Sequence, residues 1–334
     1  VDAVAPKALP AAAMAEAPIY RGGEQLQPWQ RSFVTLFLEH REIYPRVRLL
    51  LADEVGVGKT LSMATSALVS VLLGDGPVLI FTPATLALQW QVEMKDKLGI
   101  PTAVWSSQKK AWIGSEGQLL SPRGDFSQIG RCPHRIGIVS TGIIMHQREG
   151  HEFVREAGEL LKNRYGMIIL DEAHKARSTF YPGNRNPEPN NLLIFMREIA
   201  QRTKHLILGT ATPIQTKVSE LWDLLGILGN GADFVMGDSL SPWREVDNAV
   251  DLVTGRKQPA DAEEAWRWIC NPLPPADEDI LFSNIREELA ISKNRYTCPH
   301  DYGDLGYMIQ EMWLPSALER GYFRQNSPLV RHVV

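Results

Sequence analysis

The sequence has few cysteines, no long hydrophobic run and no excess of positive charge, and each absence excludes a class of protein. Its 334 residues include only three cysteines, too few for a disulfide-held scaffold, and this odd, sparse count indicates a reducing compartment. The apolar runs at 49–52 and 167–170 are far too short to cross a bilayer. The net charge of −4 excludes a uniformly basic nucleic-acid binder, although it allows a local basic face.

The composition is that of a globular protein, with 44% hydrophobic and 22% charged residues. The length gives room for one large domain or two ordinary ones. Residues 1–20 are rich in Ala and Pro, lack a basic start and are interrupted by Pro6, Pro10 and Pro18. We therefore expect a linker there rather than a signal peptide. Because the chain begins with Val1 and stops within an apolar and basic run, we expect a piece of a longer protein.

Short apolar strands alternate with amphipathic helices over the first two thirds of the chain. The patterns predict strands at 48–52, 78–81, 136–140, 167–170 and 206–208, and helices at 21–42, 60–73, 85–98, 152–161 and 191–202. This alternation predicts an α/β fold whose parallel sheet is covered by helices on both faces. We expect residues 106–135 to form a polar surface loop and 178–190 a turn-rich segment.

From about Phe234 the alternation stops, and residues 238–313 are predicted to be mainly helical. This region carries four tryptophans, Trp243, Trp266, Trp268 and Trp313. Trp clustered with Leu and Ile is most often buried, so a small hydrophobic core is favoured over a DNA-gripping or partner-docking surface.

Residues 49–60 have the pattern strand, glycine-rich loop, helix that is typical of a phosphate-binding loop. The core Gly-x-Gly-Lys-Thr is intact, although Asp53 stands where the usual pattern has Gly. Backbone N–H groups of Gly56, Val57 and Gly58 can contact phosphate oxygens, and the helix beginning near Lys59 adds its positive end. The Lys59 ammonium suits the β- and γ-phosphates, and the Thr60 hydroxyl can bind Mg²⁺. An accidental glycine-rich turn is the alternative.

Two carboxylates follow the predicted strand at 167–170. In a parallel sheet that end of the strand faces the ligand crevice. Asp171 can hold Mg²⁺, directly or through water, and Glu172 can polarise the attacking water. A solvated acidic turn is the alternative, which the preceding apolar run and phosphate loop disfavour.

Hydroxyl side chains follow the strand at 206–208 in the same way. Thr210 and Thr212 can hydrogen-bond to the acidic loop and to a passing nucleic-acid strand. An ordinary turn before Pro213 would explain this loop equally well in isolation.

In order and spacing, these segments resemble the first motor lobe of superfamily-2 helicases, and more narrowly that of the Swi/Snf-type ATPases. Residues 53–60 are similar to motif I, 81–90 to motif Ia, 136–141 to motif Ib, 171–175 to motif II (a DEAH box) and 209–215 to motif III. Residues 220–225, Glu-Leu-Trp-Asp-Leu-Leu, are typical of the Swi/Snf branch, and 26–30 resemble its entry motif. The likeness covers roughly 24–230 and returns at 324–334.

The resemblance implies a RecA-like lobe that binds ATP and Mg²⁺ and translocates on duplex DNA. It makes Lys59, Asp171 and Glu172 catalytic, Gln30 the adenine contact, and His174, Thr210 and Thr212 coupling residues. The implied nucleic-acid contacts are to the DNA backbone rather than to bases. They are made by Thr82, Pro83, Gln89, Trp90, Ser140, Thr141, Lys175 and Thr212. For Trp90, packing of the ring on the sheet is the alternative.

The resemblance also implies a domain division: a linker at 1–20, the motor lobe at 21–232, a helical insertion at 233–312 and a connector at 313–334 toward a second lobe. That lobe would supply the arginines that complete hydrolysis, so the chain alone is expected to bind ATP and hydrolyse it poorly. The likeness is to bacterial members, including the RNA-polymerase-recycling ATPase and helicase-like subunits of phage-defence systems, which implies a bacterial cytoplasmic protein.

Two other functions stay open at this point. One is a nucleotide-gated interaction module of a larger complex, which the intact Lys59, Asp171 and Glu172 disfavour. The other is an RNA-directed helicase. A zinc site from the repeated Cys-Pro-His triplets, with Cys132, His134, Cys298 and His300 as ligands, is a weaker expectation, because the usual Cys-x₂-Cys pairing is absent.

Overall fold

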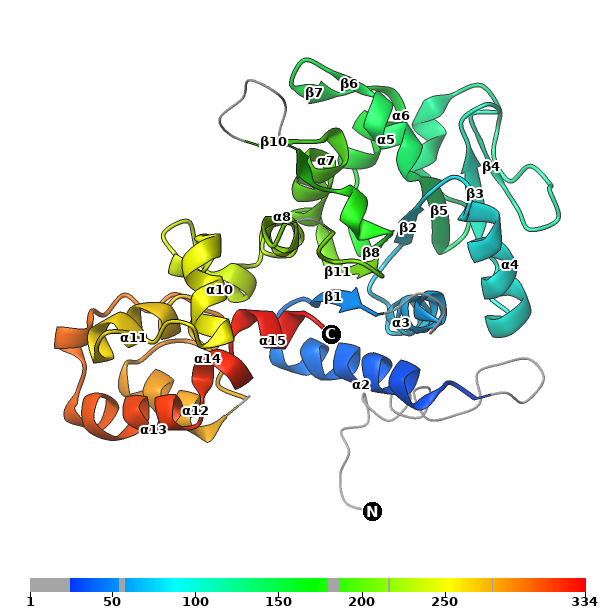
Figure 1. Ribbon diagram of the computed structural model, residues 1–334. Helices are drawn as coiled ribbons and strands as arrows, with labels where there is room; N and C mark the ends of the chain where they lie inside the picture. Colours follow the sequence, from blue (N-terminus) through cyan, green and yellow to red (C-terminus); the bar gives the residue numbers. More distant parts are fainter. Residues whose placement is uncertain (1–24, 54–57, 180–186, 216, 278) are drawn as a thin grey trace.

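The computed structural model describes residues 25–53, 58–179, 187–215, 217–277 and 279–334. Within them, a seven-stranded sheet forms the centre of the molecule, in the order β1-β11-β8-β2-β5-β3-β4 (Figure 1). The strands are β1 (Arg48–Ala52), β2 (Val78–Thr82), β3 (Ala103–Ser106), β4 (Ala111–Ile113), β5 (Ile136–Ser140), β8 (Tyr165–Asp171) and β11 (Thr203–Thr210). Neighbouring strands run parallel except for the antiparallel pair β3–β4.

Both faces of this sheet are buried, which explains why its strands are apolar at successive positions. On β1, Leu49 and Leu51 pack in one hydrophobic cluster while Leu50 packs in the other. On β8, Ile169 likewise faces away from Ile168. Because successive side chains of a strand point to opposite faces, each of these strands contributes side chains to both hydrophobic clusters.

Helices cover the two faces of the sheet. One cluster holds side chains of α2 (Pro28–Ile43), α3 (Lys59–Leu72) and α4 (Ala87–Leu98). The other holds side chains of α5 (Thr141–His146), α6 (Arg155–Leu161), α7 (Asn191–Ala200) and α8 (Ser219–Leu228). This confirms the predicted α/β fold. Among the described residues, none of the helices has the length and apolar character that a membrane crossing requires.

The prediction of a polar loop over 106–135 is wrong. The chain turns after β3 and returns as β4, which extends the sheet by one antiparallel strand. Trp112 on β4 is fully buried, and its indole Nε1 donates a hydrogen bond to the carbonyl of Gln128, 2.8 Å away. Polar residues on either side of this short strand hid it from the sequence pattern. Two small antiparallel strand pairs, β6 (Arg148–Glu149) with β7 (Glu152–Phe153) and β9 (Ser178–Thr179) with β10 (Glu188–Pro189), complete the described strands.

Beyond α8 the chain forms a helical region, which lies beside the sheet lobe in Figure 1. Trp243, Trp266 and Trp268 are buried in it and Trp313 is half-buried against the same cluster, so the expectation of a hydrophobic core is confirmed. Two helices inside the predicted connector, α13 and α14, pack on this same region. Its helices are α9 (Asp233–Met236), α10 (Val246–Thr254), α11 (Ala262–Ile269), α12 (Ile280–Glu288), α13 (Leu314–Glu319) and α14 (Tyr322–Gln325).

The last residues return to the sheet. After α15 (Pro328–His332), Val333 forms a parallel bridge with Leu50. The amide of Ala52 donates to the carbonyl of Val334, and the amide of Val334 donates to the carbonyl of Leu50, 2.8 Å away. The end of the described chain thus lies against β1, directly before the phosphate loop.

Candidate functional site

A cleft of about 1220 Å³ opens at the carboxyl ends of β1 and β8. This is the edge where ligands bind in open parallel sheets. The cleft brings together residues that lie up to 186 positions apart in the sequence, from Gln25 to Ala211. The predicted residues that line it are Gln30, Gly58, Lys59, Thr60, Gln89, Asp171 and Glu172. Gly56 and Val57 lie outside the described residues.

The phosphate-loop residues meet the start of α2 in one wall of the cleft. Gly58 has φ +83°, a conformation that favours glycine, directly before α3 begins at Lys59. The Lys59 ammonium donates a hydrogen bond to the carbonyl of Asp53, 2.7 Å away, across the loop. The side-chain amide of Gln30 donates to the carbonyl of Gly58 at 3.2 Å. Gln30 therefore lies beside the loop, and its role as the adenine contact stays a prediction.

Protein donors hold the Asp171 carboxylate in place at the floor of the cleft. Oδ2 accepts hydrogen bonds from the Thr82 hydroxyl at 3.1 Å and from the Trp90 indole at 2.8 Å. Oδ1 accepts from the amide of Glu172 at 3.0 Å. Oδ1 keeps acceptor capacity after these bonds, whereas Oδ2 already accepts two. Because a carboxylate and the Thr60 hydroxyl are oxygen donors of the kind that Mg²⁺ prefers, the residues present fit this ion.

Glu172 has the left-handed φ of +54°, which is uncommon for a residue with a side chain. Its Oε2 lies 3.2 Å from Nδ1 of His174. The same Nδ1 lies 3.1 Å from the Thr210 hydroxyl. Burial lowers the pKa of His174, against the opposing effect of the nearby Glu172 carboxylate. The structure thus brings His174 and Thr210 together, as the coupling prediction requires, while Thr212 lies two residues on with an exposed side chain.

Three of the predicted nucleic-acid contacts are corrected by the structure. The side chains of Thr82, Trp90 and Thr141 are buried, and the first two bind Asp171. The alternative for Trp90, packing on the sheet, is the right one. Gln89, Lys175 and Thr212 are exposed, and Pro83 and Ser140 are half-buried. The Ser140 hydroxyl accepts from the amide of Gly142 and so caps α5.

The sequence reasoning missed the charged face of α4. Glu93 and Lys97 line the cleft together with Gln89. Their spacing of four residues was the available signal, because residues four apart share one face of a helix.

The structure separates the two Cys-Pro-His triplets. Cys132 lies beside Gly137 of β5. Cys298 belongs to the helical region, where its amide donates to the carbonyl of Cys270 at 3.0 Å. Across the part of the chain that the structure describes, His, Cys, Asp and Glu side chains form no group of three or more suited to a metal ion. The zinc expectation is therefore wrong for these residues.

Comparison with known proteins identifies relatives of this lobe. The chain is 29% identical over 185 residues to the "Uncharacterized ATP-dependent helicase YqhH" of Bacillus subtilis, covering 55% of this chain and 26% of the relative. It is 29% identical over 216 residues to the "ISWI chromatin-remodeling complex ATPase ISW1" of Saccharomyces cerevisiae, covering 64% of this chain and 16% of the relative. The chain therefore spans about a quarter or less of the length of these relatives.

Solved structures and a family model complete the comparison. The "Sulfolobus solfataricus SWI2/SNF2 ATPase core in complex with dsDNA" aligns with 72% of this chain and 42% of its own, at 18% identity and a TM-score of 0.47. The family model described as the SNF2-related domain matches residues 29–236, more than half of the chain. The chain belongs to the SNF2-related domain family.

Proposed function

We propose that this chain is the ATP-binding motor lobe of a DNA-dependent ATPase that translocates along duplex DNA, with hydrolysis completed by a second lobe. The names of its relatives support the proposal, since they include an ATP-dependent helicase and a chromatin-remodelling ATPase. We place it in the bacterial cytoplasm, which its three free cysteines favour. A role in phage defence stays a prediction.

One observation carries the proposal: the cleft gathers Lys59, Thr60, Asp171 and Glu172 beside the buried Gln30. An ammonium, a hydroxyl and two carboxylates at the carboxyl edge of a parallel sheet are the groups that phosphoryl transfer uses. An accidental glycine-rich turn or a solvated acidic turn would not place them in one cleft.

In this proposal each side chain has a separate task. Lys59 leaves the Asp53 carbonyl and binds the β- and γ-phosphates. Thr60 and Asp171 hold Mg²⁺, which neutralises phosphate charge when bound. Glu172 orients and polarises the attacking water. Gln30 contacts the adenine.

The DNA contacts proposed here use exposed or half-buried groups only. They are Gln89, Ser140, Lys175 and Thr212, whose side-chain donors suit phosphates and carry no sequence information, and Pro83, which has no N–H and contributes packing only. The second lobe, in cis or from a partner subunit, supplies the arginines that stabilise the developing charge, a contribution of about 10³–10⁵ in rate in related systems. We expect the chain alone to bind ATP and turn it over slowly.

The test is ATP turnover by the full-length protein with no nucleic acid, duplex DNA, single-stranded DNA or RNA. We expect the strongest stimulation from duplex DNA, and loss of turnover in Lys59→Ala. Stimulation by RNA alone would favour an RNA-directed helicase. ATP binding without turnover under any condition would favour a nucleotide-gated interaction module, and turnover like that of the wild type in Lys59→Ala would remove the phosphate-loop assignment.

A further inference from the structure

Helix α8 receives hydrogen bonds from the segment that leaves motif II. Asp223 accepts from the backbone amide of Ser178 at 2.6 Å and from the Ser178 hydroxyl at 3.0 Å. It also forms an ion pair with Arg197 of α7 at 3.1 Å. The Asp223 side chain is only 13% exposed, so water competes weakly for these bonds. Ser178 lies seven residues after Asp171, and its position is therefore tied to α8.

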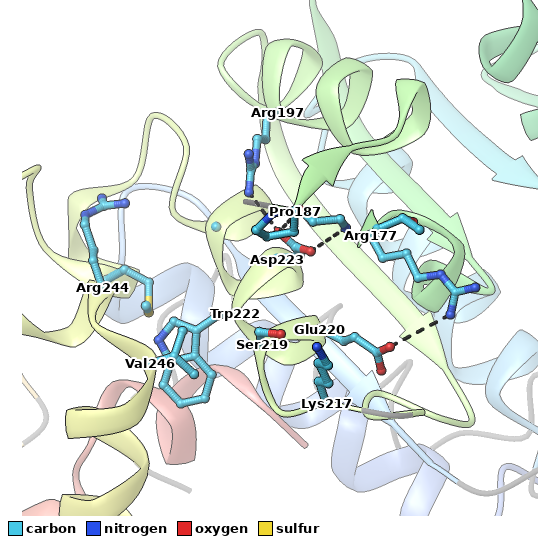
Figure 2. Close-up of a pocket in the computed structure, with 14 residues that line it drawn as sticks. Arg177, Pro187, Arg197, Lys217, Ser219, Glu220, Trp222, Asp223, Arg244 and Val246 are labelled. Carbon is cyan, nitrogen blue, oxygen red and sulfur yellow. Dashed lines mark hydrogen bonds and ion pairs between the residues drawn. The ribbon is translucent and has the colours of Figure 1, made fainter. Parts of the chain in front are cut away.

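The same helix also accepts a hydrogen bond from the segment that ends motif III. Glu220 accepts a hydrogen bond from the backbone amide of Gln215 at 2.6 Å. Arg177 bridges the two segments, since its guanidinium donates to the Gln215 side chain at 2.6 Å and lies 3.9 Å from the Glu220 carboxylate. Figure 2 shows Glu220 and Asp223 reaching from α8 toward Arg177 and Arg197. Both ATP-site loops thus end on one turn of α8.

Between these two carboxylates in the sequence, Trp222 points the other way, into the helical region. Its indole Nε1 donates to the carbonyl of Trp243 at 2.8 Å, and the Trp243 indole donates in turn to the carbonyl of Trp268 at 2.8 Å. The two rings of Trp243 and Trp268 meet edge to face, 4.9 Å apart. A continuous line of indole contacts therefore runs from α8 to α11.

A cavity of about 530 Å³ lies beside this line, between α8 and the start of the helical region (Figure 2). Gly226 lines it from α8, and Met236 and Val246 line it from the other side. The Trp222 indole, which is buried, makes a hydrogen bond across the junction.

We propose that Glu220, Trp222 and Asp223 form a coupling hub that transmits the nucleotide state of the motif II and motif III loops to the helical region. This inference rests on the proposed function only in requiring that ATP binds the cleft. The carboxylates fix the two loop exits to α8, so a shift in either loop moves the helix. Trp222 passes that movement to Trp243. The three are positioning residues, because none of them lines the ATP cleft.

Hydrogen exchange of the full-length protein, with and without a non-hydrolysable ATP analogue, tests the hub. In the wild type we expect the analogue to change exchange by about threefold or more in the segments 237–246 and 262–270. In Asp223→Asn and Trp222→Phe that change should vanish, while the change around 171–178 remains. The dissociation constant of the analogue should stay within about twofold, since coupling and binding are separate free energies.

Two matched variants separate coupling from folding. Asp251→Asn removes a surface carboxylate of α10 that pairs with Arg256, and Trp266→Phe removes an indole that donates to the carbonyl of His300 within the helical region. Both should keep the response of the wild type. A full response in Asp223→Asn and Trp222→Phe, or no response of the helical region in the wild type, would overturn the hub. If the analogue fails to bind the wild type, the proposed function itself has failed.

Discussion

Glu172 and Asp171 are adjacent in the sequence but occupy different environments. Three protein donors fix Asp171, whereas Glu172 is half-exposed to the cleft and is turned there by a left-handed backbone. This division matches one carboxylate that holds an ion and one that acts on water.

The first prediction follows from that division. Glu172→Gln keeps the size of the side chain but removes its charge, so ATP should still bind within about threefold while turnover falls by about a hundredfold or more. A fluorescent ATP analogue measures binding, and phosphate release measures turnover. Glu93→Gln, in the same cleft, should change turnover little. Loss of binding in Glu172→Gln would instead give Glu172 a structural role.

Trp90 supports a second prediction. Trp90→Phe keeps most of the ring packing but removes the donor to Asp171, a charge-assisted bond of about 1.5–3 kcal/mol. We expect the kcat of the full-length ATPase to fall about tenfold. Mg²⁺ should also bind more weakly, so the variant should need higher concentrations of the ion to reach its full rate.

Trp105→Phe is the matched control for that prediction. Trp105 is also buried, but its indole nitrogen has no hydrogen-bond partner among the residues that the structure describes, so the substitution trims a ring without removing a bond. Equal losses of kcat in the two variants would show that packing alone, and not the bond to Asp171, explains the effect.

At this scale the sequence predicted the residue types of the site but not every role. The spacing of motif II predicted two carboxylates at a strand end, and both line the cleft. Trp90 has the spacing of a helix face, which cannot distinguish a ring that faces DNA from one that is buried. That depends on whether Asp171, 81 residues later, needs a donor.

Among the elements, α2, α3 and β11 are joined by a single buried carboxylate. Asp75 follows α3 and accepts hydrogen bonds from Arg41 of α2, from Lys204 and from Ser70, and it lies 3.3 Å from His205 of β11. Burial raises the pKa of Asp75, but the bonds from His205, Lys204 and Arg41 outweigh burial and hold it well below the usual range.

Asp75→Asn should therefore destabilise the whole sheet lobe. The variant leaves Arg41 and Lys204 without their counter-charge, although the half-exposed Lys204 can turn to water instead. We expect a loss of about 2–3 kcal/mol in the free energy of unfolding, measured by urea denaturation. Asp96→Asn, on the exposed side of α4, should cost less than about 0.5 kcal/mol. Equal costs for the two would contradict the joining role.

Strand prediction succeeded where burial on both faces leaves an uninterrupted apolar run. The predicted bounds of β1 and β5 match the structure, because each is a short run ended by a polar or small residue. It failed for β4, because its three apolar residues, Ala-Trp-Ile, are too short a run to stand out between polar neighbours. This edge strand is formed by pairing with β3, and a local sequence pattern does not show that pairing.

At the scale of the whole molecule, an aromatic cluster joins the sheet lobe, the helical region and the end of the chain. Tyr44 after α2 stacks on Phe234 of α9 with ring centroids 4.7 Å apart, and His40 meets His332 of α15 at 5.5 Å. The Nδ1 of His332 lies 2.9 Å from the carbonyl of Arg48 on β1. No local pattern predicts this cluster, since its members come from opposite ends of the sequence.

Both histidines of this cluster must be neutral in the folded protein. Burial lowers the pKa of His40 to about 4, and it lowers the pKa of His332 well below the ordinary value of 6.5. In the unfolded chain both would titrate near 6.5. Between pH 4 and 6.5 the unfolded chain therefore binds more protons than the folded one, so acidification favours unfolding.

The pH dependence of stability gives the last prediction. As the pH falls from 6.5 toward 4, His40 alone should lower the free energy of unfolding by about 3 kcal/mol. The limiting slope is about 1.4 kcal/mol per pH unit for each buried histidine. Urea denaturation at pH 7, 6 and 5 measures that slope. His40→Gln should reduce it, whereas replacing the exposed His146 should not. Asp75 affects the same measurement only below about pH 4, because above its ordinary pKa of 3.8 it is charged in both the folded and the unfolded chain. An unchanged slope in His40→Gln would therefore mean that this cluster does not hold His40 neutral in the folded protein.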